Sequence, residues 1–132
     1  MHFIIFLIII IIMNNYYLTC ILLKDCPYSI SANNLLKEYK INSHVVWINN
    51  TNKKEKEKYK TDKISTFPQI YLKKKNTVGN ILIGGYSELK TLVDLVYKKS
   101  VNDDNINIIM NKYNYSKKTC LRIIQLINNI NL

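Results

Sequence analysis

The sequence predicts an α/β fold in which helices flank a central four-stranded mixed sheet, followed by a C-terminal helical extension. The apolar patterns of residues 16–99 follow the order strand, helix, strand, short helix, strand, strand, helix. A helix between the first two strands favours a parallel pair, because parallel neighbours need a long crossover connection. Only a polar segment separates the last two strands, which favours an antiparallel hairpin.

The first strand and helix are predicted around a cysteine. Residues 16–23 (YYLTCILL) form an aromatic and aliphatic run typical of a buried strand, with Cys20 as a small buried hydrophobe. Apolar residues at helical spacing then indicate a helix: Tyr28, Ala32, Leu35, Leu36 and Tyr39. Pro27 suits the first turn of this helix, so Cys26 lies where the helix begins.

The remaining elements of the predicted sheet follow. Residues 43–48 (SHVVWI) form the second strand, with His44 as a surface residue, and the polar residues 49–63 form a short helix or a loop. Residues 69–72 and 81–83 form the hairpin strands on either side of the polar segment 73–80. After Gly84-Gly85, apolar residues at helical spacing predict a helix to about Lys99.

Beyond Ser100 the chain changes character. Residues 102–105 are rich in Asn and Asp and are interpreted as a linker. Two amphipathic helices follow, around residues 106–113 and 121–127, with Ser116 as the cap of the second. We expect them to stack against the domain; the alternative is an appendage that binds a partner. The predicted organisation is an N-terminal leader or anchor (1–14), one domain (15–100) and a helical extension (101–132).

An unbroken apolar run of about eleven residues, 3–13, opens the chain. It matches the core of a signal peptide in length and falls short of the roughly twenty residues that span a bilayer. A positively charged leading segment and a small-residue cleavage site are missing. Membrane anchor, signal and Ile-rich appendage stay open, and the expected location is cytoplasmic or membrane-associated.

Charge and cysteine content exclude some classes of partner. Nineteen basic and nine acidic residues give a formal charge of +10, but no basic stretch is interleaved with aromatic residues, so nucleic acid is not the expected partner. The three cysteines, an odd number without a C-x-x-C pair, predict neither a disulfide framework nor a zinc site. The chain reads as one made for a reducing compartment.

Three short segments carry candidate chemistry. The free N–H groups at a helix start stabilise the thiolate of Cys26, and Lys24 adds a positive charge. Ser29 cannot form a disulfide with Cys26, so any redox cycle needs an external thiol. A cis peptide before Pro68 would turn backbone groups toward an extended peptide, and Gly84-Gly85 before a helix allows close approach and an anion site.

These segments together resemble the glutaredoxin family over about residues 16–99. The family pattern is C-P-Y-C or C-P-Y-S after the first strand, a T-V-P segment with a cis proline, and G-G followed by small or acidic residues. Here these are C-P-Y-S at 26–29, T-F-P at 66–68 and G-G-Y-S-E at 84–88. The resemblance implies a thioredoxin-like fold with glutathione as the reductant.

The resemblance also implies roles for single residues. Cys26 would be the nucleophile, within the active-site motif completed by Pro27, Tyr28 and Ser29. Lys24 would bind the glycyl carboxylate of glutathione. The implied glutathione-binding residues are Lys24, Tyr28, Thr66, Phe67, Pro68, Gly85, Tyr86 and Ser87.

The sequence departs from the family pattern at three places. Ser29 resembles the monothiol or serine-variant branch, some secretory-membrane members of which carry an apolar amino-terminal anchor. Tyr86 replaces a small residue or cysteine, and Ser87 stands where an acidic residue is common, which leaves the γ-glutamyl end least defined. Ser65 replaces a basic residue or glutamine, with Lys63 the nearest substitute.

Three functional hypotheses follow. The first is a glutathione-dependent oxidoreductase that reduces mixed disulfides of glutathione with proteins, or small disulfides, by a monothiol mechanism. The second is a homodimer in which Cys26 of each protomer and two glutathiones hold a [2Fe–2S] cluster; no other metal is expected. The third is a degenerate thioredoxin-fold domain used for docking, suggested by the altered pair Tyr86-Ser87.

Overall fold

The sheet has four strands in one continuous ladder. The computed structural model describes residues 15–128 and contains β1 (Tyr16–Leu23), β2 (Ser43–Ile48), β3 (Gln69–Lys74) and β4 (Asn80–Gly84) in the order β2-β1-β3-β4. β1 pairs in parallel with β2 and antiparallel with β3, and β3 pairs antiparallel with β4. This confirms the predicted four-stranded mixed sheet.

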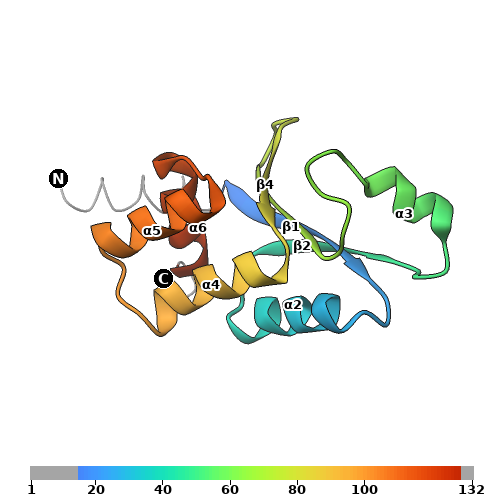
Figure 1. Ribbon diagram of the computed structural model, residues 1–132, viewed down its shortest axis with the longest axis horizontal. Coiled ribbons are helices and arrows are strands. Elements are labelled where there is room, and N and C mark those ends of the chain that lie inside the picture. Colours follow the sequence, from blue (N-terminus) through green and yellow to red (C-terminus); the bar gives the residue numbers. More distant parts are fainter. Residues whose placement is uncertain (1–14, 129–132) are drawn as a thin grey trace.

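The two long helices of the predicted domain pack together on one side of the sheet. α2 (Pro27–Glu38) makes the crossover between β1 and β2, and α4 (Tyr86–Tyr97) follows β4. They contact each other, and Figure 1 shows α2 below the sheet with α4 beside it. α3 (Lys53–Tyr59) lies at the other end of the molecule (Figure 1). Asn52 caps α3 by accepting a 3.1 Å hydrogen bond from the N–H of Glu55, so the polar segment forms a helix and not only a loop.

Alternation along β1 divides the apolar side chains between two clusters. Leu18, Cys20 and Leu22 belong to the main core, whereas Ile21 and Leu23 belong to a smaller cluster on the opposite face. The side chain of Cys20 is fully buried, as predicted for a small core hydrophobe. β1 is therefore covered on both faces, as expected of a central strand that reads as an apolar run.

The hairpin strands are longer than predicted. β3 continues through Lys74 and β4 begins at Asn80, although the polar segment 73–80 was expected to be the turn. The pairings of Tyr16 with Lys74 and of Lys73 with Asn80 hold these polar residues in the ladder. Pairing with a neighbouring strand outweighs low strand propensity here.

The linker prediction for residues 102–105 is wrong. α5 (Asp103–Tyr113) begins inside this segment, and the side chain of Asn102 accepts a 2.9 Å hydrogen bond from the N–H of Asn105. Asn is a favoured N-cap residue and two Asp side chains suit the first turn, so the composition read as a linker is that of a helix start. Ser116 caps α6 (Lys117–Asn128) as predicted, with its hydroxyl accepting a 3.1 Å hydrogen bond from the N–H of Thr119.

The C-terminal helices stack on the rest of the fold, as expected. Ile123 and Ile127 of α6 are fully buried in the main core, together with residues of β1 and α4. The hydroxyl of Tyr97 donates a 3.0 Å hydrogen bond to the carbonyl of Ile127. Figure 1 shows α5 and α6 beside α4, at the end of the sheet away from α3.

The apolar run 3–13 lies outside the described residues, so its interpretation as anchor, signal or appendage stays a prediction. Among residues 15–128, no helix is long and apolar enough to cross a membrane.

Candidate functional site

The turn between β1 and α2 places the candidate nucleophile. The N–H of Lys24 donates to the carbonyl of Ile48 at 2.9 Å, and the N–H of Cys26 donates to the carbonyl of Leu23 at 3.3 Å. Asp25 between them takes a left-handed conformation with φ 63°. The chain thus reverses tightly at the end of β1 and presents Cys26 at the start of α2.

Cys26 is the N-cap of α2. Its backbone is extended (φ −96°, ψ 121°), Pro27 follows in the first turn, and no side chain of the described residues caps this helix end. The first turn also lacks an acidic residue. The first N–H groups of a helix have no partner within the helix, so this end of α2 is a place that favours a negative charge.

Ser29, in the first turn of α2, does not line the groove described below. Its side chain is fully buried, and its hydroxyl accepts a 3.0 Å hydrogen bond from the N–H of Leu23. The serine therefore ties the first turn of α2 to the end of β1, a structural role that the sequence motif alone does not reveal.

The glycine pair brings the start of α4 against the Pro68 segment. The Phe67–Pro68 peptide bond is cis. A Cβ on Gly85 would lie 3.4 Å from the carbonyl oxygen of Pro68, and one on Gly84 would meet the Glu88 side chain at 2.6 Å. Gly84 also has φ +138°, which L side chains rarely adopt, so glycine is required at that position. The carboxylate of Glu88 accepts a 3.0 Å hydrogen bond from the N–H of Gly85.

A groove of about 730 Å³ lies between these segments. Except for Lys24, all the residues that the sequence assigned to glutathione binding line it: Tyr28, Thr66, Phe67, Pro68, Gly85, Tyr86 and Ser87. Lys24 is exposed on the β1–α2 turn, outside the groove lining.

Cys26 lies next to the groove and not in its wall. Its half-buried side chain packs against the small cluster formed by Ile21, Leu23 and Ile48, against which Phe67 of the groove also packs. Phe67 thus links the groove to the small cluster against which Cys26 packs.

Two tyrosine rings flank the groove near the thiol. The centroids of the Tyr28 and Tyr86 rings lie 6.2 Å apart, with an interplanar angle of 43°. The Tyr28 side chain is 64% exposed, so its ring is available to a ligand or to a protein partner. The tyrosine that departs from the family pattern thus faces the tyrosine of the active-site motif.

Sequence reasoning missed a further wall of the groove, which the C-terminal extension supplies. Tyr113 and Tyr115 line it, with ring centroids 5.6 Å apart. The hydroxyl of Tyr113 donates to Thr91 Oγ1 at 3.0 Å, and that of Tyr115 donates to the carbonyl of Ile83. Burial raises the pKa of Tyr115, and the nearby charge of Glu88 adds to the shift. The only sequence signal is a tyrosine pair at the turn between two helices.

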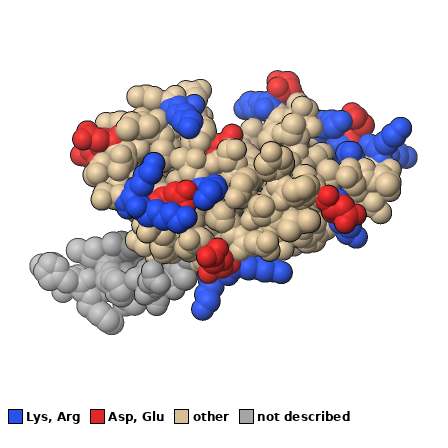
Figure 2. Space-filling model, turned by 60° about the horizontal axis from the view of Figure 1, so that its bottom comes forward, with Lys and Arg blue, Asp and Glu red and all other residues tan. Residues whose placement is uncertain are grey.

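Two charged residues also line the groove. Glu88 does so from α4, and Lys63, the nearest substitute for the missing basic residue of the family pattern, does so from the chain before β3. The groove therefore carries both signs of charge. On the face shown in Figure 2, basic and acidic side chains are likewise interspersed.

The three cysteines are free and differ in exposure. Cys20 and Cys120 are fully buried, and Cys26 is half-buried. Burial raises the pKa of Cys20 to about 12 and also raises that of Cys120. Both buried thiols are therefore held in the protonated, unreactive form near neutral pH.

Comparison with known proteins finds a matching family and similar solved structures. The glutaredoxin family matches residues 9–76, which include Cys26 and Pro68 and end before Gly84-Gly85. The crystal structure of glutaredoxin 1 from Francisella tularensis, complexed with cacodylate, is 26% identical, covers 64% of this chain and 99% of its own, and has a TM-score of 0.46. No curated protein matches the sequence significantly.

Proposed function

This chain belongs to the glutaredoxin family of thiol–disulfide oxidoreductases, with a thioredoxin-like α/β fold, and we propose that it reduces glutathione mixed disulfides by a monothiol mechanism through Cys26. One observation carries the proposal. Cys26 is the half-buried N-cap of α2 beside a groove, whereas both other thiols are fully buried.

The reaction has two thiol exchanges. The Cys26 thiolate attacks the glutathione sulfur of a protein–glutathione disulfide, so the protein leaves as a thiolate and takes up a proton. A second glutathione, as thiolate, attacks the glutathione sulfur bound to Cys26. Oxidised glutathione leaves and the Cys26 thiolate is restored. Each turnover thus consumes one free glutathione, releases the protein thiol and forms one oxidised glutathione, and Ser29 takes no part.

The groove supplies the groups that a γ-glutamyl tripeptide needs. The pairing of β3 with β1 begins at Gln69, so the backbone of Thr66 and Phe67 is not part of the sheet. An extended peptide in the groove can therefore form backbone hydrogen bonds with these two residues. The N–H groups of Tyr86 and Ser87, in the first turn of α4, suit a carboxylate. Lys24 is exposed on the turn before Cys26 and would attract the second carboxylate.

The test is a mixed-disulfide assay with a small glutathione disulfide, glutathione and a coupled reductase. We expect activity in the full chain, loss of activity in Cys26→Ser, and retention in the control Cys120→Ala, with circular dichroism confirming that both variants fold. Full activity in Cys26→Ser, or equal loss in the two variants, would overturn the assignment.

Calorimetry separates this function from that of a docking domain. Folded Cys26→Ser should bind oxidised or reduced glutathione, and Ser87→Pro, which removes an amide of the α4 start, should weaken that binding. A folded protein without a binding isotherm would instead be the degenerate interaction domain.

A second candidate function is a shared [2Fe–2S] cluster. Each chain offers one accessible thiolate, and within residues 15–128 no group of three or more His, Cys, Asp and Glu side chains could hold a metal. A four-thiolate cluster would therefore need two protomers and two glutathiones. Tyr28 and Ile30, exposed next to Cys26, offer apolar surface for such a pairing. Expression with iron and glutathione should then give a brown dimer; a colourless monomer counts against the cluster.

A further inference from the structure

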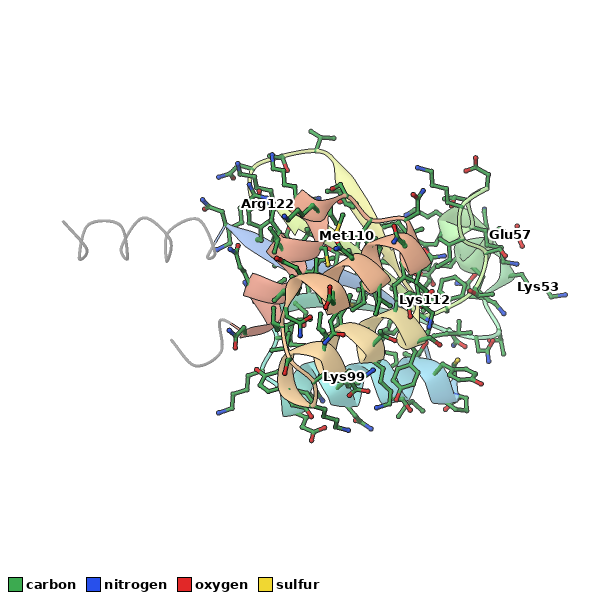
Figure 3. All side chains as sticks on the ribbon, turned by 60° about the vertical axis from the view of Figure 1, so that its left-hand side comes forward. Lys53, Glu57, Lys99, Met110, Lys112 and Arg122 are labelled. Carbon is green, nitrogen blue, oxygen red and sulfur yellow. The ribbon has the colours of Figure 1, made fainter. Side chains whose placement is uncertain are left out.

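A second pocket lies at the opposite end of the sheet from Cys26. It has a volume of about 350 Å³ and is bounded by the start of β1, the hairpin of β3 and β4, and α6. Its walls combine apolar side chains with three cationic ones, Lys74, Lys118 and Arg122. None of the lining residues is acidic. Figure 3 shows Arg122 close to the beginning of β1.

Arg122 is the lining residue that distinguishes this pocket. It is the only arginine of a chain that otherwise uses lysine for positive charge. Its guanidinium carbon lies 4.5 Å from the centroid of the Tyr16 ring, a stacking arrangement that lysine cannot reproduce. Its Nε is buried and has no hydrogen-bond partner among the described residues. A buried donor without a partner costs stability, and a ligand that accepts from this side chain would offset that cost.

The positive charge of the pocket is not neutralised by the ion pairs of the described chain. Those ion pairs join Lys60 to Glu57, and Lys90 and Lys98 to Asp94, all outside the pocket. Lys74 lies over the same ring as Arg122, with its Nζ 5.9 Å from the centroid of Tyr16. A pocket lined by one guanidinium and two ammonium groups matches a phosphate, which accepts several charge-assisted hydrogen bonds.

We propose that this pocket binds a phosphate group. A phosphate can come from the headgroup of an anionic phospholipid or from a soluble phosphate ester. The position of the pocket favours the lipid, because Tyr16 forms part of its wall and the apolar run 3–13 joins the domain only two residues before Tyr16. An apolar segment combined with a basic patch gives stable membrane association where either alone is weak.

Binding of the pocket to a membrane surface would also orient Cys26 relative to that surface. β1 is eight residues long, so its two ends lie roughly 23 Å apart. With the pocket against the headgroups, Cys26 at the far end of β1 faces the aqueous side. This inference is independent of the proposed redox function.

Two measurements on the full chain test the proposal. Because the chain has one arginine, its Nε–H gives one NMR signal, which should shift on adding glycerol 3-phosphate or inorganic phosphate. Co-sedimentation with phosphatidylcholine vesicles, with and without phosphatidic acid, reports the lipid. Arg122→Gln should weaken binding to the anionic vesicles about fivefold. Lys54→Gln, which removes the same charge from α3, should bind like the wild type.

The outcomes are distinct. A response to both probes, or to the anionic vesicles alone, supports a lipid headgroup site; a response to the soluble phosphates alone supports the pocket and assigns it to a soluble ester. An unmoved Nε signal with equal vesicle binding by Arg122→Gln and Lys54→Gln overturns the proposal. If Arg122→Gln does not fold, the exposed Lys118→Gln replaces it, with a smaller loss expected. Mixed-disulfide activity should be unchanged in all three variants.

Discussion

The three cysteines have the same side chain, but Cys26 has different surroundings from Cys20 and Cys120. Cys20 sits in a central strand and Cys120 in α6, both without exposed surface, whereas Cys26 opens a helix. A strand interior removes water from a thiol and opposes its ionisation, and a helix start supplies N–H groups to the sulfur. The position in the fold therefore sets the environment of each thiol.

Alkylation should report this difference directly. At about pH 8, iodoacetamide should modify Cys26 in the native protein while Cys20 and Cys120 stay unmodified. With the pKa of Cys20 at about 12, only roughly one in 10⁴ of its side chains is thiolate at that pH. Peptide mass spectrometry after timed quenching measures the three rates, and denatured protein is the control in which all three should react. Equal native rates would contradict the burial.

Ser29 is expected to stabilise the folded protein and to take no part in the thiol–disulfide reaction. Ser29→Ala removes the acceptor of the buried N–H of Leu23, which costs about 1–3 kcal/mol when a buried group is left unpaired. Urea denaturation should show this loss, with mixed-disulfide activity retained at temperatures where the variant is folded. Ser31→Ala, two residues further along α2, is the matched control and should change stability little. Lost activity in folded Ser29→Ala would show a catalytic role instead.

Residue-scale predictions from the sequence succeed where the cause is local. The cap position of Cys26 follows from Pro27 and the apolar spacing behind it, and the close approach at Gly85 follows from a glycine pair before a helix. Tyr113 and Tyr115 could not be predicted as groove residues. They reach it through the packing of α5 and α6, and no local pattern encodes the place where a packed helix docks.

At the element scale, the junction of β4 and α4 is the most constrained connection of the groove. Gly84→Ala should destabilise the protein by about 1–3 kcal/mol, because φ +138° is strained for alanine and the added Cβ would lie 2.6 Å from the Glu88 side chain. Displacing Glu88 also frees the N–H of Gly85 and shifts the start of α4, so glutathione binding should weaken.

Gly79, in the turn between β3 and β4, provides the control for Gly84→Ala. A Cβ on Gly79 would have nothing within 4 Å, so Gly79→Ala should leave both stability and activity close to those of the wild type. Urea denaturation and calorimetry with glutathione measure the pair. Equal effects of the two substitutions would contradict the close packing at Gly84.

Element bounds were predictable where apolar periodicity defines them and not where composition is ambiguous. The bounds of β1 and β2 agree with the sequence because apolar runs end at polar turns. Residues 102–105 were misread because Asn and Asp serve both linkers and helix caps, and only the following turn of helix distinguishes the two. Lys73 and Asn80 extend their strands because they pair with each other across the hairpin. The pattern of apolar residues along the sequence does not show such a pairing.

At the scale of the whole molecule, one core joins the parts that the sequence suggests as domain and extension. The main cluster contains Leu89 and Leu92 of α4 together with Ile123 and Ile127 of α6. The amphipathic stripe of α6 predicts that one face is buried but not the surface that buries it. The C-terminal extension also lines the groove, through Tyr113 and Tyr115. The candidate site and the C-terminal helices are therefore expected to unfold together.

Alkaline pH should test that coupling through Tyr115, which joins the two parts by its hydrogen bond to Ile83. The pKa of Tyr115 is raised in the folded protein, chiefly by burial, whereas in the unfolded chain it is about 10. Between these two values the unfolded state has already lost the proton and the folded state keeps it. The free energy of unfolding should therefore be unaffected below about pH 10 and fall as the pH rises above it.

Urea denaturation between about pH 8 and 11 should show this fall in the wild type and a shallower one in Tyr115→Phe. At the lower pH the variant should lose about 1 kcal/mol, since the hydroxyl no longer satisfies the carbonyl of Ile83. Tyr28→Phe, whose side chain is 64% exposed, is the control and should keep the wild-type slope. A wild-type slope in Tyr115→Phe would mean that the extension separates from the domain before this tyrosine ionises.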